Sequence, residues 1–431
     1  MGILNKMLGL IKKKLLGKSL KKSTWYGVVG LVLWVALSTV GFAEGYSLDW
    51  EVGVETRLFT EGASYEQQNH TVSIRTQAEF YYAWNNGNDS VEFVPWYVVD
   101  QQDEERTHGD IQELAWIHVG DDWELRTGVR KVFWGVTESV HLVDIINQSD
   151  MTLSLDGEDK LGQPMINLSL VNDWGIVDFF ILPGHRKRLF AGEDGRPRST
   201  FVVTEEDATY ESSDEDHRID AAIRWQVSID DWEIALSHFS GTSREPTILP
   251  VPNADLELLT FYPVIDQSGL EVQYIAGDWI WKLESIVRSG QGDQYTAAVG
   301  GTEYTQVGVF DTDIDIGWIA EVTSDDRGLD APHFSERDIV VGTRWALNDA
   351  ANSQALIVVS VDSKTGEQLW SLEASRRFYD SWFVTIEMLV FANAGDAPTV
   401  ADMMSGNVDI RRKMAAFSND DYLQVEVVKY F

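Results

Sequence analysis

Hydrophobic and polar residues alternate over long stretches of this chain. In residues 72–84 mostly apolar side chains occupy every second position, and polar or charged side chains fill the positions between them. Residues 48–58 and 421–431 show the same pattern, and the latter ends on Phe431. A period of two is that of a β-strand with two different faces. Such strands suit a wall with lipid on one side and water on the other.

The alternation recurs along the chain, and we expect about 18 strands, with 16 as the alternative. Pro95 lies inside the third segment and cannot donate a ladder hydrogen bond, so that segment fits a strand least well. The expected strands are 46–59, 70–84, 90–99, 110–119, 123–133, 164–171, 174–182, 217–229, 231–241, 267–277, 278–288, 303–310, 313–323, 336–347, 353–362, 367–378, 382–393 and 421–431.

The connections between these segments differ in length. Most connections after odd-numbered strands are long and polar, and 134–163, 183–216 and 394–420 are long enough to fold inward. Long outer loops and short periplasmic turns are typical of bacterial barrels, and an even strand number leaves both chain ends on the periplasmic side. The pattern therefore predicts an all-β fold, a transmembrane antiparallel up-and-down β-barrel. The short turns after even-numbered strands are 85–88, 120–122, 172–173, 230–231, 277–278, 311–312 and 380–381.

Tryptophans mark the short-turn end of the predicted barrel. Five of them directly follow a short turn and a sixth ends its strand at the same level. Indole rings prefer the boundary between hydrocarbon and headgroups, so we expect an aromatic girdle at the periplasmic rim. The alternative is the core of a β-sandwich or propeller, but the opposite strand faces are too charged to pack as a second layer. The predicted girdle is Trp84, Trp123, Trp174, Trp232, Trp279 and Trp382.

Charged residues of both signs alternate with the apolar positions and would face the lumen. An unpaired charge in a dry interior costs several kcal/mol, so a lumen with this composition should be wet. Arginines and carboxylates facing each other across water can select solutes. Alternatively, they pair along the wall and only stiffen it. The predicted pore-lining residues are Arg75, Glu79, Glu124, Arg126, Arg130, Arg224, Glu284, Arg344, Glu373, Arg377 and Glu387.

The first 43 residues have the composition of an export signal. Seven lysines precede an apolar run at 26–39, and no acidic residue occurs before Glu44. We therefore expect a signal peptide at 1–43 and the outer-membrane β-barrel at 44–431. An uncleaved anchor is the alternative, although about 14 apolar residues fall short of the roughly 20 that a spanning helix needs. Met7 is an alternative start.

Charge and composition exclude several functions. The chain has 69 Asp and Glu against 34 Lys and Arg, a formal charge of -35, which excludes nucleic acid as a partner of the whole surface. It has no cysteine, so disulfides and thiolate metal sites are impossible. A basic cluster at 185–188 with Arg196 and Arg198 would bind lipopolysaccharide phosphates, attract anions to the channel, or simply be solvated.

The chain shows little sign of catalysis. His238 lies beside Ser237 and Ser240, and outer-membrane lipases use Ser with His, but no G-x-S-x-G motif occurs and histidines near serines often arise by chance in a chain of this size. His-x-x-x-His spacing and a Gly-rich phosphate loop after a strand are also missing. We expect neither an enzyme nor a bound cofactor or metal.

Several short motifs carry a resemblance to a family. They resemble those of uncharacterised porin-like outer-membrane proteins of proteobacteria, which are distantly similar to alginate-export-type barrels. The resemblance implies a barrel and a pore but no particular substrate, and Val136 stands where such relatives have Glu. The motifs are LRTG at 125–128, WG at 134–135, NQSD at 147–150, GQPM at 162–165, LPG at 182–184, GRPR at 195–198, SHF at 237–239, GTSREP at 241–246 and RWALND at 344–349.

Together these patterns predict a porin-type channel for passive or selective diffusion of small hydrophilic solutes in the outer membrane of a Gram-negative bacterium. The alternatives are an export or lipid-handling partner of an inner-membrane transporter, and a barrel plugged by its own loops. The expected partners are outer-membrane lipids and lipopolysaccharide, the barrel assembly machinery that reads Phe431, the solutes, and further copies of the chain in a homo-oligomer.

Overall fold

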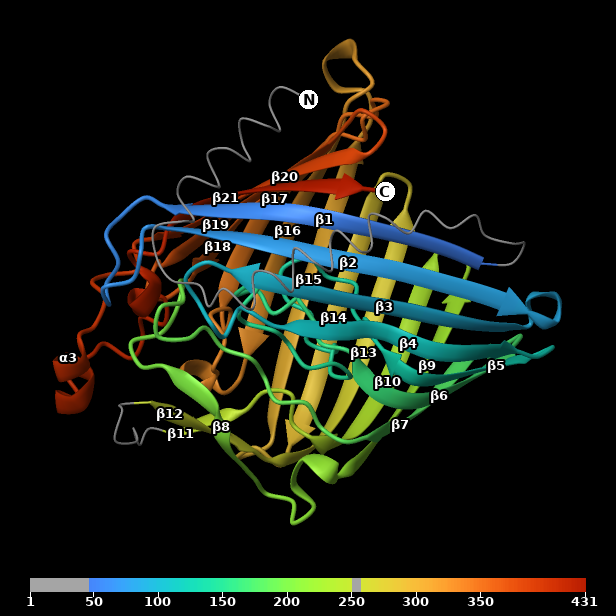
Figure 1. Ribbon diagram of the computed structural model, residues 1–431, viewed down its shortest axis with the longest axis horizontal. Helices are drawn as coiled ribbons and strands as arrows, with labels where there is room; N and C mark the ends of the chain where they lie inside the picture. Colours follow the sequence, from blue (N-terminus) through green and yellow to red (C-terminus); the bar gives the residue numbers. More distant parts are fainter. Residues whose placement is uncertain (1–45, 250–256) are drawn as a thin grey trace, which may run out of the picture. The chain divides into compact units, whose positions relative to one another are not determined.

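A closed barrel of eighteen antiparallel strands forms the described part of the chain (Figure 1), which comprises residues 46–249 and 257–431 of this computed structural model. The first and last strands pair from Glu51↔Tyr430 to Phe59↔Tyr422 and so close the ring. The number of strands is the predicted 18 and excludes 16. The expected signal peptide at 1–43 lies outside the described residues.

The strands follow the alternation of the sequence closely. In chain order they are β1 (Tyr46–Phe59), β2 (His70–Trp84), β3 (Asp89–Asp100), β4 (Gly109–Val119), β5 (Trp123–Arg130), β6 (Gln163–Asn172), β7 (Gly175–Pro183), β9 (Ile219–Ile229), β10 (Trp232–Thr242), β13 (Val264–Ala276), β14 (Trp279–Ser289), β15 (Tyr295–Gln306), β16 (Asp315–Asp325), β17 (Asp338–Ala346), β18 (Gln354–Asp362), β19 (Gln368–Phe378), β20 (Trp382–Ala392) and β21 (Tyr422–Tyr430).

Most strand limits lie within three residues of the predicted ones, and the differences at β5 and β15 have a physical reason. β5 ends at Arg130 instead of 133, because the chain leaves the wall there and turns inward. β15 begins at Tyr295 instead of 303, since its first residues include small side chains without a clear alternation. Pro95 is accommodated within β3 by a register shift against β4 between Val94 and Pro95.

Elements outside the barrel sheet lie in the long loops. β8 (Val203–Tyr210), β11 (Thr247–Leu249) and β12 (Leu258–Tyr262) form a separate three-stranded sheet, in which β8 and β12 are parallel. The short helix α3 (Val400–Ser405) begins with a capping box at Thr399. Single 3-10 turns occur at Asn85–Gly87, Glu215–His217, Val309–Asp311, Gly328–Asp330 and Ala415–Phe417.

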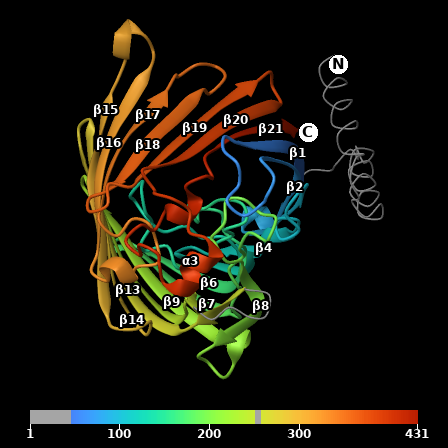
Figure 2. The same cartoon turned by 90° about the vertical axis from the view of Figure 1, so that its left-hand side faces the viewer.

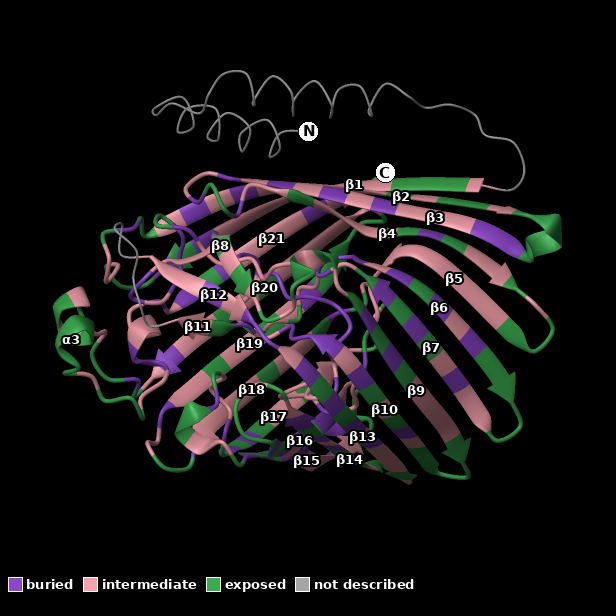
Figure 3. Cartoon of the chain, turned by 90° about the horizontal axis from the view of Figure 1, so that it is seen from below, coloured by how far each residue is buried: buried purple, intermediate pink, exposed green. Residues whose placement is uncertain are grey.

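The long loops crowd one end of the barrel and partly fill it (Figure 2). The buried core is therefore formed between the loop that connects β5 to β6 and the inner wall, rather than between two sheets. Trp134, Val143 and Ile146 of this loop pack against wall residues such as Phe180 and Phe239. Colouring by burial shows buried and exposed residues alternating along strands such as β6 and β7 (Figure 3).

The outer face of the barrel is apolar. Large hydrophobic side chains remain exposed on most strands, among them Ile181, Val322 and Ile386. Among the described residues, no helix is both long and apolar enough to cross a membrane.

The six tryptophans of the predicted girdle all lie at the short-turn end. The five that belong to strands, Trp84, Trp123, Trp232, Trp279 and Trp382, stand in register with outward positions. Trp174 lies in the turn between β6 and β7 and is 58% exposed. Tyr274 stacks on Trp232 at 4.4 Å and Tyr304 lies 4.8 Å from Trp279, which widens the aromatic band. That this band meets lipid headgroups stays a prediction.

Candidate functional site

The predicted pore-lining residues share the inner face of the wall. Cross-strand register links them, because directly opposed residues point to the same side of a sheet. Glu284 stands opposite Glu271, and Glu373 stands opposite Glu387. Arg75, Glu79, Glu124, Arg126, Arg130, Arg224, Arg344 and Arg377 occupy the same face of their strands.

Many of these charges are paired along the wall. Arg224 binds Glu271 through two nitrogens at 3.0 and 2.8 Å. Arg126 pairs with Glu124 on its own strand, and Arg130 lies 3.4 Å from Glu113 on the adjacent strand β4. This is the arrangement expected if the charges stiffen the wall, and it leaves these arginines largely neutralised.

The loop 131–162 is fixed to the inner wall by two carboxylates. Glu284 is fully buried, and it accepts hydrogen bonds from the Val136 and Thr137 amides at 2.7 and 3.0 Å and from the Thr137 hydroxyl at 2.7 Å. Glu321 accepts bonds from the Glu138 and Ser139 amides, both at 2.9 Å. Glu284 was expected to line the pore, but its burial means that it holds the loop and does not contact solvent.

Hydrophobic packing holds the same loop from its other side. Trp134 is 3% exposed and meets Phe180 of β7 edge to face at 5.7 Å. Gly135 adopts φ +140°, and a Cβ there would lie 2.9 Å from the Glu284 carboxylate. A side chain at this position would therefore push the loop away from its acceptor, which explains the need for glycine.

Ion pairs link the two halves of the loop. The Lys160 ammonium lies 3.2 Å from Asp144, and His141 Nε2 lies 3.5 Å from Glu158. Burial lowers the pKa of His141, but the hydrogen bond with Glu158 and the charges of Glu284, Glu158 and Asp144 together outweigh burial, so the pKa is raised overall. The same bond lowers the pKa of Glu158. The pair therefore favours the state in which His141 is protonated and Glu158 is deprotonated.

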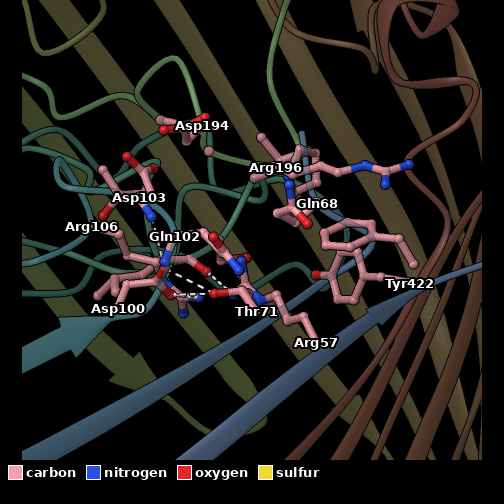
Figure 4. Close-up of a pocket in the computed structure, with 18 of the residues that line it drawn as sticks. Arg57, Gln68, Thr71, Asp100, Gln102, Asp103, Arg106, Asp194, Arg196 and Tyr422 are labelled. Atoms are coloured by element: carbon pink, nitrogen blue, oxygen red, sulfur yellow. Dashed lines mark hydrogen bonds and ion pairs between the residues drawn. The ribbon is translucent and has the colours of Figure 1, made fainter. Parts of the chain in front are cut away.

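A small pocket remains where the long loops meet at the long-loop end of the barrel (Figure 4). Thr71, Asp100 and Arg106 gather on one side of the pocket, with Tyr422 away from them (Figure 4). Its cavity volume is about 20 Å³, enough for roughly one water molecule. Arg196, another lining residue, binds Asp420 at 2.5 Å. This bond ties the loop between β7 and β8 to the loop between β20 and β21.

The basic cluster at 185–188 makes bonds within the molecule. Arg186 donates to Asp110 at 2.6 Å, Lys187 donates to the Glu205 carbonyl at 2.8 Å, and Arg188 donates to Gln148 at 3.2 Å. Burial and the nearby Arg244 lower the pKa of His185 to about 2, so this histidine is neutral. The interpretation of this cluster as a simply solvated loop is therefore wrong.

The arrangement of His238 and Ser237 does not support catalysis. The two residues are neighbours on β10 and therefore point to opposite faces of the sheet. His238 lies on the outer face, where its ring nitrogen is 3.0 Å from Ser268. Within the described ranges, no group of His, Cys, Asp and Glu could hold a metal ion.

Two residues of the site were not singled out by the sequence. Glu321 resembles any other acidic residue on an alternating strand, and its partners are backbone amides of a distant loop, which leave no sequence signal. Phe133 was expected within the fifth strand, but it lies on the inward segment after β5 and is 61% exposed. The early end of the β5 to β6 pairing at Arg130↔Gln163 is visible only in the structure.

Comparison with known proteins shows the fold alone. No family model and no curated protein matches the chain. A BenF-like porin from Pseudomonas fluorescens is 8% identical, with 91% of this chain and 99% of that chain covered and a TM-score of 0.51. Wzi, an outer-membrane carbohydrate-binding β-barrel involved in group 1 capsule assembly in Escherichia coli, is also 8% identical, with 96% and 89% covered and a TM-score of 0.51. The structural neighbours are thus porins and outer-membrane barrels.

Proposed function

We propose that this protein is a porin-type channel in the outer membrane of a Gram-negative bacterium, selective for small hydrophilic solutes. The observation that carries the proposal is the loop 131–162, which Glu284 and Glu321 hold against the inner wall of a closed barrel. A loop anchored in this way narrows the bore at a fixed place. The fold shared with a porin supports the same function.

Charges around the lumen supply the selectivity in this proposal. Glu373, Glu387 and Glu426 lie on the inner face of three consecutive strands, β19 to β21. Arg75 lies on the inner face of β2, two strands further along the ring from β21. Solutes that pass the loop would meet an acidic arc beside a basic residue, and such an arrangement can orient and select them.

The barrel is proposed to reach the membrane by the usual route for exported barrels. Residues 1–43 would direct export, and the terminal Phe431 would be read by the assembly machinery. The ring of Phe431 stacks on Trp50 at 3.8 Å, next to the pairing of β1 with β21. Lipids, lipopolysaccharide and further copies of the chain are the proposed contacts of the outer wall.

Single-channel recording in planar bilayers tests the proposal. Protein refolded in detergent should give discrete conductance steps in KCl, and vesicles that contain it should swell in small sugars but not in large ones. Heat-denatured protein is the control. Complete absence of conductance at any voltage would exclude a channel.

The plugged barrel is the second candidate, because a specific observation favours it. The loops at the outer mouth are tied together by buried bonds such as Arg196 to Asp420, and the pocket between them is about 20 Å³. A silent barrel that still binds sugars would instead be comparable to Wzi, a carbohydrate-binding β-barrel. Calorimetry with oligosaccharides measures whether a barrel without conductance binds sugars, and so separates the sugar-binding barrel from the plugged barrel and from the export-partner alternative.

A further inference from the structure

Phe133 is an exposed aromatic residue on the inward loop. Its neighbours Val132 and Trp134 both pack against the buried cluster on the inner wall. Because extended residues alternate in direction, Phe133 points away from that wall and toward the bore. Its exposed fraction is 61%, whereas that of Trp134 is 3%.

The ring of Phe133 is held in place although it is exposed. His141 meets it edge to face at 4.8 Å with an interplanar angle of 82°. The Trp134 amide donates to Asp144 at 3.3 Å, and the Val132 amide donates to Asn147 at 2.9 Å, which fixes the backbone on both sides of Phe133. A fixed ring loses little entropy when a ligand stacks on it.

The surroundings of this ring are acidic. Glu158, 3.5 Å from His141, has a side chain that is 61% exposed. Glu373 on β19 lies within electrostatic range of Glu158, Asp156 and Glu138. The basic groups among these residues are Arg344, which is paired with Glu138, and His141 and Lys160, which both act on Glu158. The carboxylates that act on His141 and Glu373 therefore outnumber the basic groups, and His141 connects this acidic network to the Phe133 ring.

We infer that Phe133 and the carboxylates around it form a binding site for organic cations, in particular for alkylated ammonium groups. A cation over the face of an aromatic ring is attracted by the negative face of the ring, and nearby carboxylates add to the attraction. The inference rests on the proposed channel function and names one class of solute for it.

Choline and its uncharged isostere 3,3-dimethylbutanol test the site. Choline should reduce the single-channel K⁺ current in a concentration-dependent way, and the isostere should not. Phe133→Leu keeps an apolar side chain but removes the ring, so it should weaken choline binding by about 3-fold to 30-fold. Phe133→Tyr should keep wild-type affinity. Phe383→Leu, on the same inner face of β20, is the matched control and should also bind normally.

The outcomes separate the site from the channel. Titration calorimetry of choline into detergent-solubilised protein measures binding without any current. If choline binds in the calorimeter but the protein gives no conductance in bilayers, the cation site is supported and the channel function is overturned. Equal affinity for choline and its isostere, or unchanged choline affinity in Phe133→Leu, would overturn the cation site. A larger conductance in Phe133→Leu with unaltered choline block would make Phe133 a steric constriction only, and would also overturn the site.

Discussion

At the scale of single residues, the sequence places a charge on a face but does not reveal its partner. Glu284 and Glu373 both stand on the inner face, and both were predicted there as pore-lining residues. In the structure Glu284 accepts bonds from loop amides and is fully buried, because the loop 131–162 happens to cross the wall at that height. The difference depends on contacts between residues about 150 positions apart in the chain, which no local pattern encodes.

Glu284→Gln should loosen the loop. Hydrogen bonds to a charged group contribute about 1.5 to 3 kcal/mol each. In addition, the NH2 group of Gln could face the backbone N–H groups of the loop, where two donors cannot bond to each other. We expect the amides of residues 136–143 to exchange hydrogen about 10-fold to 100-fold faster, as measured by mass spectrometry. Glu373→Gln is the control, since the described residues show no bond from Glu373 to a loop amide. Unchanged exchange in Glu284→Gln would mean that packing of Trp134 alone holds the loop.

The His141 and Glu158 pair predicts a pH optimum for loop order. The raised pKa of His141 gives stability that is complete below its unfolded value of about 6.5 and is lost as pH rises through the folded pKa. The lowered pKa of Glu158 gives stability that is present above its unfolded value of about 4.5 and is lost as pH falls. Glu284 and Asp144 add to the attraction for charged His141.

Protection of residues 131–162 should therefore be greatest between about pH 4.5 and 6.5 and weaker at pH 8. Limited proteolysis across this range measures it, with rates corrected for the protease. His141→Gln should remove the decline toward pH 8. A decline of equal size in that variant would assign the effect to other groups.

At the scale of elements, strands were predictable where both faces are constrained. Lipid on one side and polar groups on the other force strict alternation, so 18 segments were identified, most of them with limits within three residues of the observed ones. The start of β15 was missed because Ala297, Ala298 and Gly300 carry no alternation. The sheet of β8, β11 and β12 was missed because its strands are short and lie in loops. There, no lipid on one side of the strand forces apolar and polar residues to alternate.

The phase of β20 gives a prediction about lipid exposure. Ile386 points outward and is 39% exposed, whereas Thr385 stands opposite Glu426 on the inner face. Val384→Arg or Ile386→Arg should lower the free energy of unfolding by about 2 to 4 kcal/mol near mid-membrane. Thr385→Arg should be tolerated. Urea titration of protein folded into vesicles measures all three, and equal costs would show that the outer face of β20 does not contact hydrocarbon.

At the scale of the whole molecule, the two ends of the barrel differ in loop length, which predicts its orientation. A peptide tag inserted in 183–216 or 394–420 should be accessible to antibody on intact cells, and α3 within the second range carries the exposed Met404. A tag at 277–278, in the tight turn between β13 and β14, should be reached only after the outer membrane is opened. Labelling of the 277–278 tag on intact cells would reverse the orientation.

Net charge makes a final prediction about ion selectivity. Residues 44–431 hold 69 carboxylates and 27 basic groups, so the mouths should concentrate cations and the pore should prefer cations at low salt. The Debye length is about 8 Å at physiological ionic strength and about 3 Å at 1 M, so the preference should fall as salt rises. Reversal potentials across a KCl gradient measure it.

The arginines of the lumen are the competing source of selectivity. Arg75, Arg126, Arg130, Arg224, Arg344 and Arg377 would impose anion preference if they formed an unpaired filter at the constriction. The structure weakens that alternative, because Arg224 is bound to Glu271 and Arg126 to Glu124 within the wall. A paired arginine projects little field into the bore, so the acidic excess should dominate. Anion preference that persists at about 1 M salt, where only charges close to the ion act, would show instead that these arginines are the filter.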